Sequence, residues 1–365
     1  MQTLAINKIV DSEVIKTLSL EPEDSAKLAG LKYVQADKLQ ISRKKVGRGF
    51  SYFDPKGDRI DDEKELTRLK AIKVPPAIED VLFCHLPNGH LQATGRDAKR
   101  RKQYYYHPKW RKVRSQHKFN RMLLFGASLP KIRAVTEKHL KQRKLSKEKV
   151  LAAVIQLLET TLIRIGNDQY AKKNRSFGLT TLRDRHTEIK GSKIKFEFRG
   201  KSGVDHEIEL KDRRLANVIR KCQEIPGYEI FKYYDESGDR KFIDSGDVNQ
   251  YLQDITGQDF SAKDFRTWMG TVIAAIELDE LGEFDSEKEA KKNVTQAIKR
   301  VAKQLGNRPA TCRKYYVHPA IIEAYQDGFL LDLMAQTDSA ESETNGLNPE
   351  EQVVLNIIKQ SLPIE

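Results

Sequence analysis

The sequence predicts an α+β protein, in which a small β-rich N-terminal domain precedes a larger, mainly α-helical domain with a small β-hairpin sheet. The chain has 365 residues, which is more than one small core requires and enough for two domains. Apolar and aromatic residues alternate with polar ones between about residues 33 and 106. Beyond residue 118 the apolar spacing changes to the helical period. This change of period divides the chain into its two parts.

Turn signals separate the strands of the N-terminal domain, which we place at residues 1–112. The stretch GRGFSYFDPKGDRI alternates aromatic and polar residues around the turn-forming tetrapeptide Asp54–Gly57. VLFCHLPNGHLQATG supplies two short apolar strands. Asn88-Gly89 between them predicts a hairpin turn, because both residues tolerate positive φ.

Charge and cysteine content narrow the class of protein. Hydrophobic residues make up 39% and charged residues 32%, as in globular proteins, and the net charge of +13 favours nucleic acid as a partner. The three cysteines lie far apart, and the Cys84-His85-His90 group lacks a fourth ligand, so we expect neither disulfides nor a metal site. No apolar run of about 18 residues and no signal-peptide core occurs. We expect a cytoplasmic, nucleoid-associated protein without membrane contact.

The densest basic stretch of the chain is RDAKRRKQYYYHPKWRKVRSQHK. Between Arg96 and Lys118 it has ten lysines or arginines and one acid, with three tyrosines and a tryptophan interleaved. Cations neutralise phosphates, and aromatic rings pack on sugars or bases, so this pattern favours nucleic-acid contact over a solvated linker. Pro108-Lys109 marks the expected domain junction.

The second domain is expected at residues 113–335. VLAAVIQLLETTLIRIG places its apolar residues on one helical stripe, which Gly166 would end. KIKFEFRGKSGVDHEIEL alternates apolar and charged residues on both sides of a Gly/Ser turn, which predicts a β-hairpin with Lys201 at its tip. The rest, to Tyr325, has mostly helical spacing, and the helix NVTQAIKRVAKQLG ends at Gly306.

Residues 336–365 form the last predicted segment. QTDSAESETNGLNPEEQ has five acids and no base, which indicates an acidic linker. Asn348 as N-cap and Pro349 at the first helical position then predict a short terminal helix.

Common catalytic signatures are missing. Gly200–Ser202 resembles the end of a phosphate-binding loop, but Lys195 occupies the place of the required upstream glycine. No HExxH or GxSxG motif occurs, and the acids form no evident paired-metal constellation. ATP binding and metal-dependent nuclease chemistry are therefore disfavoured, and we expect no cofactor.

Several cations occupy positions that the structural pattern does not require. Arg164 interrupts an apolar helix end, Lys201 stands at a turn, and Arg266 lies among aromatic residues. Each alone could be a solvated or snorkelling side chain. The six blocks GRGFSYFDPKGDRI, PNGHLQATGRDAKRRKQYYYHPKW, IRIGNDQYAKKNRSFGLTTLRDRH, FRGKSG, KDFRTW and LGNRPATCRKYYVHP, taken together and in order, carry more information. They resemble the type IB DNA topoisomerases of the compact bacterial and poxviral kind, from about Tyr33 to Tyr325.

The resemblance implies the tyrosine recombinase/topoisomerase IB catalytic fold and a defined reaction. Such enzymes relax supercoiled duplex DNA through a 3′-phosphotyrosyl intermediate and reseal it without ATP or metal. By motif, Arg164 and Arg266 would contact the non-bridging phosphate oxygens, and Lys201 would be the general acid. The pattern C-R-K-x-Y-V-H-P makes Tyr316, not Tyr315, the nucleophile.

Other positions follow from the same resemblance. Asn307 stands where poxviral relatives have histidine, and its amide could still donate a hydrogen bond to the phosphate. The residues that match DNA-facing positions are Gln103, Tyr104, Tyr106 and Tyr170. Lys263, three residues before Arg266, fits the family's K-x-x-R spacing and would bind the DNA at the same phosphate as Arg266. The two domains of a monomer would close as a clamp around duplex DNA, with no nucleotide cofactor.

Two alternatives stay open at this point. Tyrosine recombinases use the same nucleophile and similar cations, but their second arginine typically lies in H-x-x-R, whereas this chain has Lys263-Asp-Phe-Arg266. A duplex DNA-binding protein without activity is the other alternative, against which the complete catalytic set argues.

Overall fold

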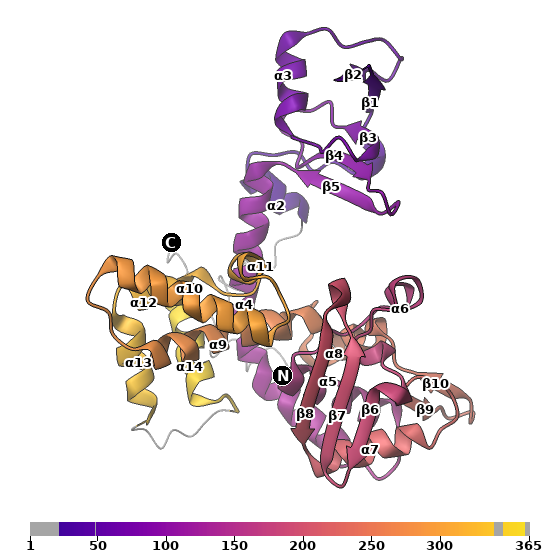
Figure 1. Ribbon diagram of the computed structural model, residues 1–365, viewed down its shortest axis with the longest axis vertical. Coiled ribbons are helices and arrows are strands. Elements are labelled where there is room, and N and C mark those ends of the chain that lie inside the picture. Colours follow the sequence, from indigo (N-terminus) through magenta and orange to yellow (C-terminus); the bar gives the residue numbers. More distant parts are fainter. Residues whose placement is uncertain (1–21, 48, 339–345, 362–365) are drawn as a thin grey trace. The chain divides into compact units, whose positions relative to one another are not determined.

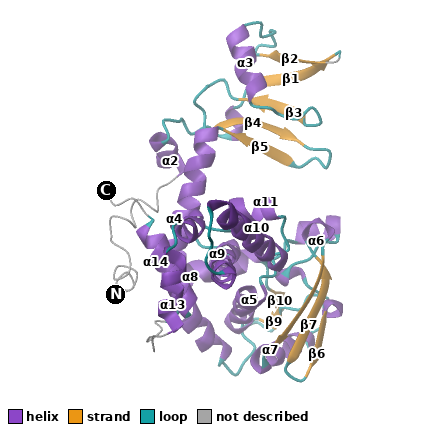
Figure 2. Ribbon diagram, turned by 60° about the vertical axis from the view of Figure 1, so that its left-hand side comes forward, coloured by secondary structure: helices purple, strands orange, loops and turns teal. Residues whose placement is uncertain are grey.

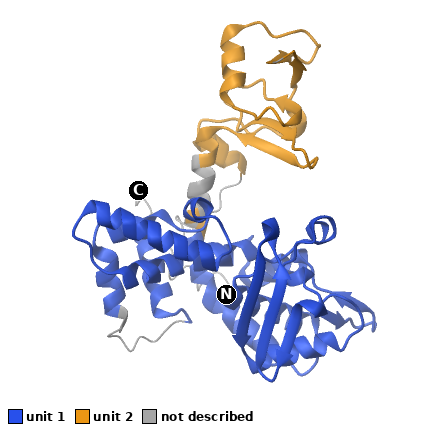
Figure 3. Ribbon diagram, viewed as in Figure 1, with its two compact units in different colours: residues 1–9, 122–365 blue, residues 10–121 orange. Residues whose placement is uncertain are grey.

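The computed structural model describes residues 22–47, 49–338 and 346–361 (Figure 1). The chain forms two compact units, one within Val10–Arg121 and the other comprising mainly Met122–Glu365 (Figure 3). The boundary lies inside helix α4, which runs from Pro108 to Leu140. The helix begins at Pro108, because proline is tolerated in the first helical turn. The boundary between the two units therefore lies further along the chain than the Pro108-Lys109 junction expected from the sequence.

The N-terminal unit is built around one five-stranded antiparallel sheet. The strand order is β2-β1-β3-β4-β5. Among the described residues, the helices α2 and α3 accompany the sheet, and α2 lies in a stretch that is weakly patterned in the sequence. The described elements are α2 (Pro22–Leu28), β1 (Ile41–Val46), β2 (Gly49–Phe53), α3 (Glu63–Ala71), β3 (Glu79–Phe83), β4 (Leu91–Arg96) and β5 (Lys102–Tyr106).

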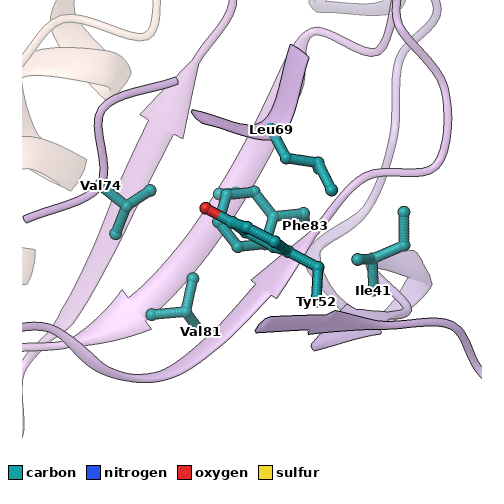
Figure 4. Packing of buried hydrophobic residues seen from close by; sticks show 7 residues of the cluster. Ile41, Tyr52, Leu69, Val74, Val81 and Phe83 are labelled. Carbon is teal, nitrogen blue, oxygen red and sulfur yellow. The ribbon is translucent and has the colours of Figure 1, made fainter. Parts of the chain in front are cut away.

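One face of this sheet is covered by α3, and apolar side chains meet between them. Figure 4 shows the buried side chains of this cluster pointing toward one another. Tyr52 on β2 and Phe83 on β3 pack edge to face, with ring centroids 5.5 Å apart. Leu69 of α3 is 1% exposed. Burial of such side chains contributes roughly 1.5–3 kcal/mol each, so this small unit has a core of its own.

The two predicted N-terminal turns had different outcomes. The Asp54–Gly57 turn is confirmed, since Gly57 donates to the Asp54 carbonyl and adopts φ +95°. The hairpin at Asn88-Gly89 is also present, because β3 and β4 pair antiparallel. The reason expected for this turn is wrong, because neither Asn88 nor Gly89 has positive φ, and the connection between the strands is longer, from Phe83 to Leu91. Gly89 is required for space, because a Cβ there would lie 2.7 Å from Sγ of Cys84.

The larger unit is mainly helical and carries a three-stranded antiparallel sheet in the order β6-β7-β8, plus the short pair β9–β10. Figure 2 shows this sheet beside α5 and α7. The described elements after α4 are α5 (Lys147–Thr161), α6 (Asp168–Asn174), β6 (Thr187–Lys190), β7 (Lys193–Arg199), β8 (Asp205–Lys211), α7 (Arg213–Gln223), β9 (Lys232–Tyr234), β10 (Arg240–Phe242), α8 (Ser245–Thr256), α9 (Ala262–Leu281), α10 (Glu287–Gln304), α11 (Pro309–Tyr315), α12 (Pro319–Gln326), α13 (Phe329–Asp338) and α14 (Pro349–Gln360).

The predicted β-hairpin is confirmed as β7 and β8. Ile194, Phe196 and Phe198 are buried, and the charged residues between them face outward. The 3-10 turn Lys201–Gly203 connects the strands, and Gly200 N–H donates to the Val204 carbonyl at 2.7 Å. The hairpin therefore presents Lys201 at its tip.

The predicted end of α5 at Gly166 is wrong. The helix ends at Thr161, and Leu162 adopts a left-handed conformation with φ +56°. Arg164 consequently lies in an extended segment after the helix rather than in its last turn. Apolar spacing continues past the helix end because residues of the extended segment, such as the 4%-exposed Ile163, are also buried. The apolar periodicity alone could not distinguish the last turn of the helix from the buried extended segment that follows it.

The terminal helix is confirmed as α14, with Asn348 as N-cap and Pro349 in the first turn. Its apolar side packs on α9, α12 and α13. Part of the predicted acidic linker, residues 339–345, lies outside the described residues, as do residues 1–21 and Arg48. Cys84, Cys222 and Cys312 are free and buried, as expected.

Candidate active site

The five residues proposed for catalysis come from separate segments of the larger unit. Arg164 follows α5, Lys201 occupies the hairpin tip, and Arg266 lies in α9. Asn307 follows α10, and Tyr316 caps the C-terminus of α11. Contacts among their side chains, and one pocket lined by the three cations, show that the fold brings these segments together.

Arg164 reaches the site because the left-handed Leu162 turns the chain out of α5. Its main-chain carbonyl accepts from Leu179 N–H at 2.9 Å, which holds the extended segment in place. The guanidinium donates to Oδ1 of Asn307 and to the Gly306 carbonyl. Burial lowers the pKa of Arg164 below its ordinary value, but the group stays cationic at neutral pH.

Arg266 is the most buried cation of the site, with 4% of its surface exposed. Nη1 donates to the Leu162 carbonyl and Nη2 to the Leu305 carbonyl at 2.6 Å. Nε is buried and has no hydrogen-bond partner among the described residues. Burial and the nearby charge of Arg164 lower the pKa of Arg266 to about 10. A guanidinium with these neighbours remains charged at neutral pH and has a free donor.

Neither of these guanidiniums has a carboxylate within ion-pair distance in the part of the chain that the structure describes. Two partly or fully buried positive charges without a counter-ion are costly. Such a site is well suited to an anion that binds there and neutralises the charges.

Asn307 provides a second free donor. Its Oδ1 accepts from Arg164, which directs the amide nitrogen Nδ2 elsewhere. Nδ2 is buried and unbonded among the described residues. Gly306 before it has φ +58°, a conformation that favours glycine and turns the chain after α10.

Tyr316 is the tyrosine that faces the cations. Cζ of Arg266 lies 5.6 Å from its ring centroid, and its side chain is half-buried. Its main-chain carbonyl accepts from Oγ1 of Thr271 on α9 at 3.2 Å. Tyr315, in contrast, is 45% exposed, and its ring lies beside Nζ of Lys314. The geometry therefore distinguishes the two adjacent phenols.

The backbone of α9 approaches the main chain at Tyr316 closely. A Cβ on Gly270 would lie 2.7 Å from the carbonyl oxygen of Tyr316. Only glycine allows this approach without displacement of the backbone.

Lys201 lines the same pocket as Arg164 and Arg266. Its side chain is exposed, and its ammonium group makes no hydrogen bond among the described residues. An exposed cation at a hairpin tip, beside a cluster of buried donors, is available to contact a bound anion.

His206 also lines this pocket, and sequence analysis missed it. It is half-buried and stacks on Phe198. A signal was present in the sequence, because His206 shares its face of β8 with Ile208 and Leu210, opposite the outward-facing acids. A histidine on the inward face of the hairpin that carries Lys201 was a recognisable candidate.

Of the residues predicted to contact DNA, the two in the larger unit do not line this pocket. Tyr170 is 51% exposed in α6, and Lys263 is exposed in the first turn of α9. In the N-terminal unit, Tyr104 and Tyr106 stack with ring centroids 6.2 Å apart on one face of β5. Gln103 donates from Nε2 to Oδ2 of Asp97 at 3.0 Å.

Residues 22–47, 49–338 and 346–361 show neither a metal site built from His, Cys, Asp or Glu side chains nor a membrane-spanning helix. No group of three or more His, Cys, Asp or Glu side chains is arranged to hold a metal ion there. No helix in these ranges is both long and apolar enough to span a bilayer. His90 of the tentative metal group instead accepts from Val34 N–H through Nδ1 at 2.9 Å and stacks on Tyr33.

Chemically, the cluster combines a phenol, two unneutralised guanidiniums and two free buried donors. Arginine forks and amides stabilise the negative charge that develops on phosphate oxygens during displacement at phosphorus. A phenol beside these cations is placed where it can act as a nucleophile.

Comparison with known proteins agrees with this chemistry. Residues 107–343 match the family model of the eukaryotic DNA topoisomerase I catalytic core, and residues 49–97 match the N-terminal domain of bacterial DNA topoisomerase IB. DNA topoisomerase 1B of Acanthamoeba polyphaga mimivirus is 30% identical over 294 residues, covering 79% of this chain and 88% of the relative. DNA topoisomerase 1B of vaccinia virus (strain Copenhagen) is 26% identical over 287 residues, covering 76% and 87%. The chain, with its tyrosine beside two uncompensated arginines, belongs to the type IB DNA topoisomerase family.

Proposed function

We propose that Tyr316 is the nucleophile with which this topoisomerase cleaves one strand of duplex DNA. The observation that carries this assignment is the pair of guanidiniums without carboxylate partners beside Tyr316. The oxygen of Tyr316 bonds to phosphorus, the bond from phosphorus to the 5′-oxygen breaks, and the phenol proton passes to water. Attack by the 5′-hydroxyl reverses these steps and reseals the strand.

The other residues of the cluster stabilise this displacement in our proposal. Nε of Arg266 and Nδ2 of Asn307 donate to non-bridging oxygens, and Arg164 adds a second positive charge. Lys201 moves from the hairpin tip and protonates the departing 5′-oxygen, which is otherwise a poor leaving group. Because the phosphotyrosyl bond retains the energy of the broken bond, turnover needs no ATP.

Residues outside the cluster are proposed to bind the duplex. The exposed Tyr104 and Tyr170 present aromatic and hydroxyl groups, and Lys263 presents a cation. We propose that a monomer closes both units around the DNA as a clamp. A net charge of +13 then makes binding fall steeply with salt. Such an enzyme would act in the cytoplasm, on the nucleoid.

The decisive experiment is relaxation of supercoiled plasmid in EDTA without ATP. Wild-type protein should relax both positive and negative supercoils. Tyr316→Phe should relax neither, while it still shifts duplex DNA in a gel. A wild-type protein without relaxation activity over a broad salt range would refute the assignment and favour a DNA-binding protein without activity.

A recombinase-like strand transferase predicts a different result. It would join strands between two DNA molecules rather than relax one. The Lys263-Asp-Phe-Arg266 block, which lacks the typical histidine, favours relaxation. Recombinant products from two labelled duplexes in the same reaction would favour the alternative.

A further inference from the structure

His206 lies between two segments of the active site that are far apart in the sequence. It is paired directly opposite Phe198 on the neighbouring strand, and the two rings stack with centroids 5.1 Å apart and planes inclined by 16°. The strand pairing and this stack fix the ring relative to the sheet.

Two glycines allow the ring to touch the backbone on both sides. A Cβ added to Gly200 would lie 2.6 Å from Cδ2 and Nε2 of His206, and one added to Gly306 would lie 2.8 Å from Cε1. Both distances are well inside the optimal separation of about 3.5–4.0 Å between nonbonded carbons. The ring therefore fills the space between the hairpin tip and the turn after α10.

Each glycine directly precedes a residue of the proposed machinery. Lys201 follows Gly200, and Asn307 follows Gly306. The Lys201 ammonium has no hydrogen-bond partner among the described residues. Its position therefore depends on the backbone of the hairpin tip. The ring wedged between these glycines therefore lies between the segment that carries Lys201 and the segment that carries Asn307.

The imidazole acts through its shape and its lack of charge. It makes no hydrogen bond within the described chain, and the charged groups that face it are Arg164, Arg266 and Asp205. Burial, followed by the charges of the two arginines, lowers the pKa of His206 below its ordinary value. It is neutral at pH 7 and adds no positive charge to that of the two arginines.

We propose that His206 is a positioning residue for leaving-group protonation: it holds the tip that carries Lys201 at the correct distance from the phosphate site. This inference rests on the proposed role of Lys201 as general acid. Loss of the ring releases the tip, and the ammonium no longer reaches the 5′-oxygen efficiently. Attack by Tyr316 is affected much less.

The test compares two suicide substrates in single-turnover cleavage, one with an ordinary phosphodiester and one with a 5′-bridging sulfur. A thiolate leaves without a proton, so only the ordinary substrate needs the acid. For His206→Ala we expect cleavage of the ordinary substrate to fall about 10- to 100-fold, since displacements of about 1 Å have effects of this size. Cleavage of the sulfur substrate should stay within about threefold of wild type, which a merely structural role would not produce. Equal slowing on both substrates would overturn the inference.

Lys201→Ala, measured in parallel, tests the proposed function separately. Rescue of this variant by sulfur supports the acid role. If Lys201→Ala shows no rescue, the role of Lys201 itself is wrong. If Lys201→Ala is rescued and His206→Ala is not, only the positioning inference fails.

A second variant covers the case in which His206→Ala unfolds. Gly200 has φ −93°, which alanine tolerates, so Gly200→Ala introduces only the clash with the ring. We expect it to reduce cleavage of the ordinary substrate selectively. In the His206→Ala background the Gly200→Ala substitution should slow cleavage of the ordinary substrate by less than about threefold, because the methyl group no longer clashes with the ring. Equal slowing of both substrates by Gly200→Ala would overturn the inference, and so would fully additive losses where His206→Ala folds. His139→Ala, which removes a histidine bonded to Tyr251, is the control and should cleave both substrates like wild type.

Discussion

Replacing Glu351 by glutamine removes one charge from the contact between the terminal helix and the rest of the larger unit, without change of shape. Glu351 is 1% exposed and accepts from Nη1 and Nη2 of Arg133, each at 2.8 Å. It also accepts from Nε1 of Trp268 at 3.1 Å and from Asn348 N–H at 2.9 Å. Glutamine would place its amide N–H group against one of these donors. It would also weaken the remaining hydrogen bonds, because its oxygen carries no full negative charge.

The expected cost follows from burial. Removing one partner of a buried ion pair costs about 3–5 kcal/mol. Arg133 is 26% exposed on its side chain and keeps Glu159 as a partner, so we take the lower end, about 3 kcal/mol. For a unit of this size about 1 kcal/mol lowers the melting temperature by about 2–4 °C, which gives a decrease of about 6–12 °C.

Thermal and urea unfolding, followed by circular dichroism, measure this loss. Glu350→Gln is the matched control: the neighbouring glutamate makes no ion pair among the described residues and should change stability by less than about 0.5 kcal/mol. A loss below about 1 kcal/mol for Glu351→Gln would show that the buried pair does not hold α14 in place.

The pH dependence of the difference provides a further check. Burial alone would raise the pKa of Glu351, but the hydrogen bonds from Arg133, Asn348 N–H and Trp268 outweigh it and lower the pKa. A carboxyl whose pKa is lower in the folded state contributes stability above its unfolded pKa of about 4.3 and loses it as pH falls through the folded value. The gap between wild type and Glu351→Gln should therefore be full at pH 7 and shrink below about pH 4.

Three further predictions concern the site and its surroundings. Tyr316→Phe should abolish the covalent DNA adduct on denaturing gels. Tyr315→Phe should relax plasmid at a rate within about twofold of wild type, because Tyr315 is exposed. An adduct formed by Tyr316→Phe would show that Tyr316 is not the nucleophile. Gly270→Ala should cost about 1–3 kcal/mol and slow cleavage, because its Cβ would lie 2.7 Å from the Tyr316 carbonyl; unchanged cleavage would show that the backbone adjusts freely. Burial and the charges of neighbouring arginines lower the pKa of His186 to about 4, so the folded state resists protonation and wild type loses stability as pH falls from about 6.5 toward 4. Between pH 7 and pH 4.5, His186→Gln should lose about 1–2 kcal/mol less than wild type in urea unfolding, and parallel curves would contradict the buried neutral state.

Local signals in the sequence were sufficient for much of the fold. The alternation in β7 and β8, the apolar stripe of α10 and the cap of α14 each depend on residues a few positions apart, and all three are confirmed. The order of the motif blocks was likewise enough to recognise the family. Such features are determined by period, turn chemistry and capping, which require no knowledge of distant contacts.

The sequence also narrowed the choice between the two tyrosines, and the structure shows the physical difference. Tyr316 lies against Arg266, and Tyr315 faces solvent. That contact joins α9 to the end of α11, segments about fifty residues apart along the chain.

Long-range packing decided the rest. The helix α5 ends before Leu162, and the apolar residues beyond it are buried as an extended segment. Arg164 therefore lies outside the helix, where it lines the pocket. The positioning role proposed for His206 depends on the contact of its ring with Gly200 of its own hairpin and with Gly306, about a hundred residues further along the chain. The sequence by itself determined which residue types and local elements exist, since these depend on neighbours along the chain. Only the tertiary structure decided which buried donors remain unpaired, because this depends on which acceptors distant segments place beside each donor.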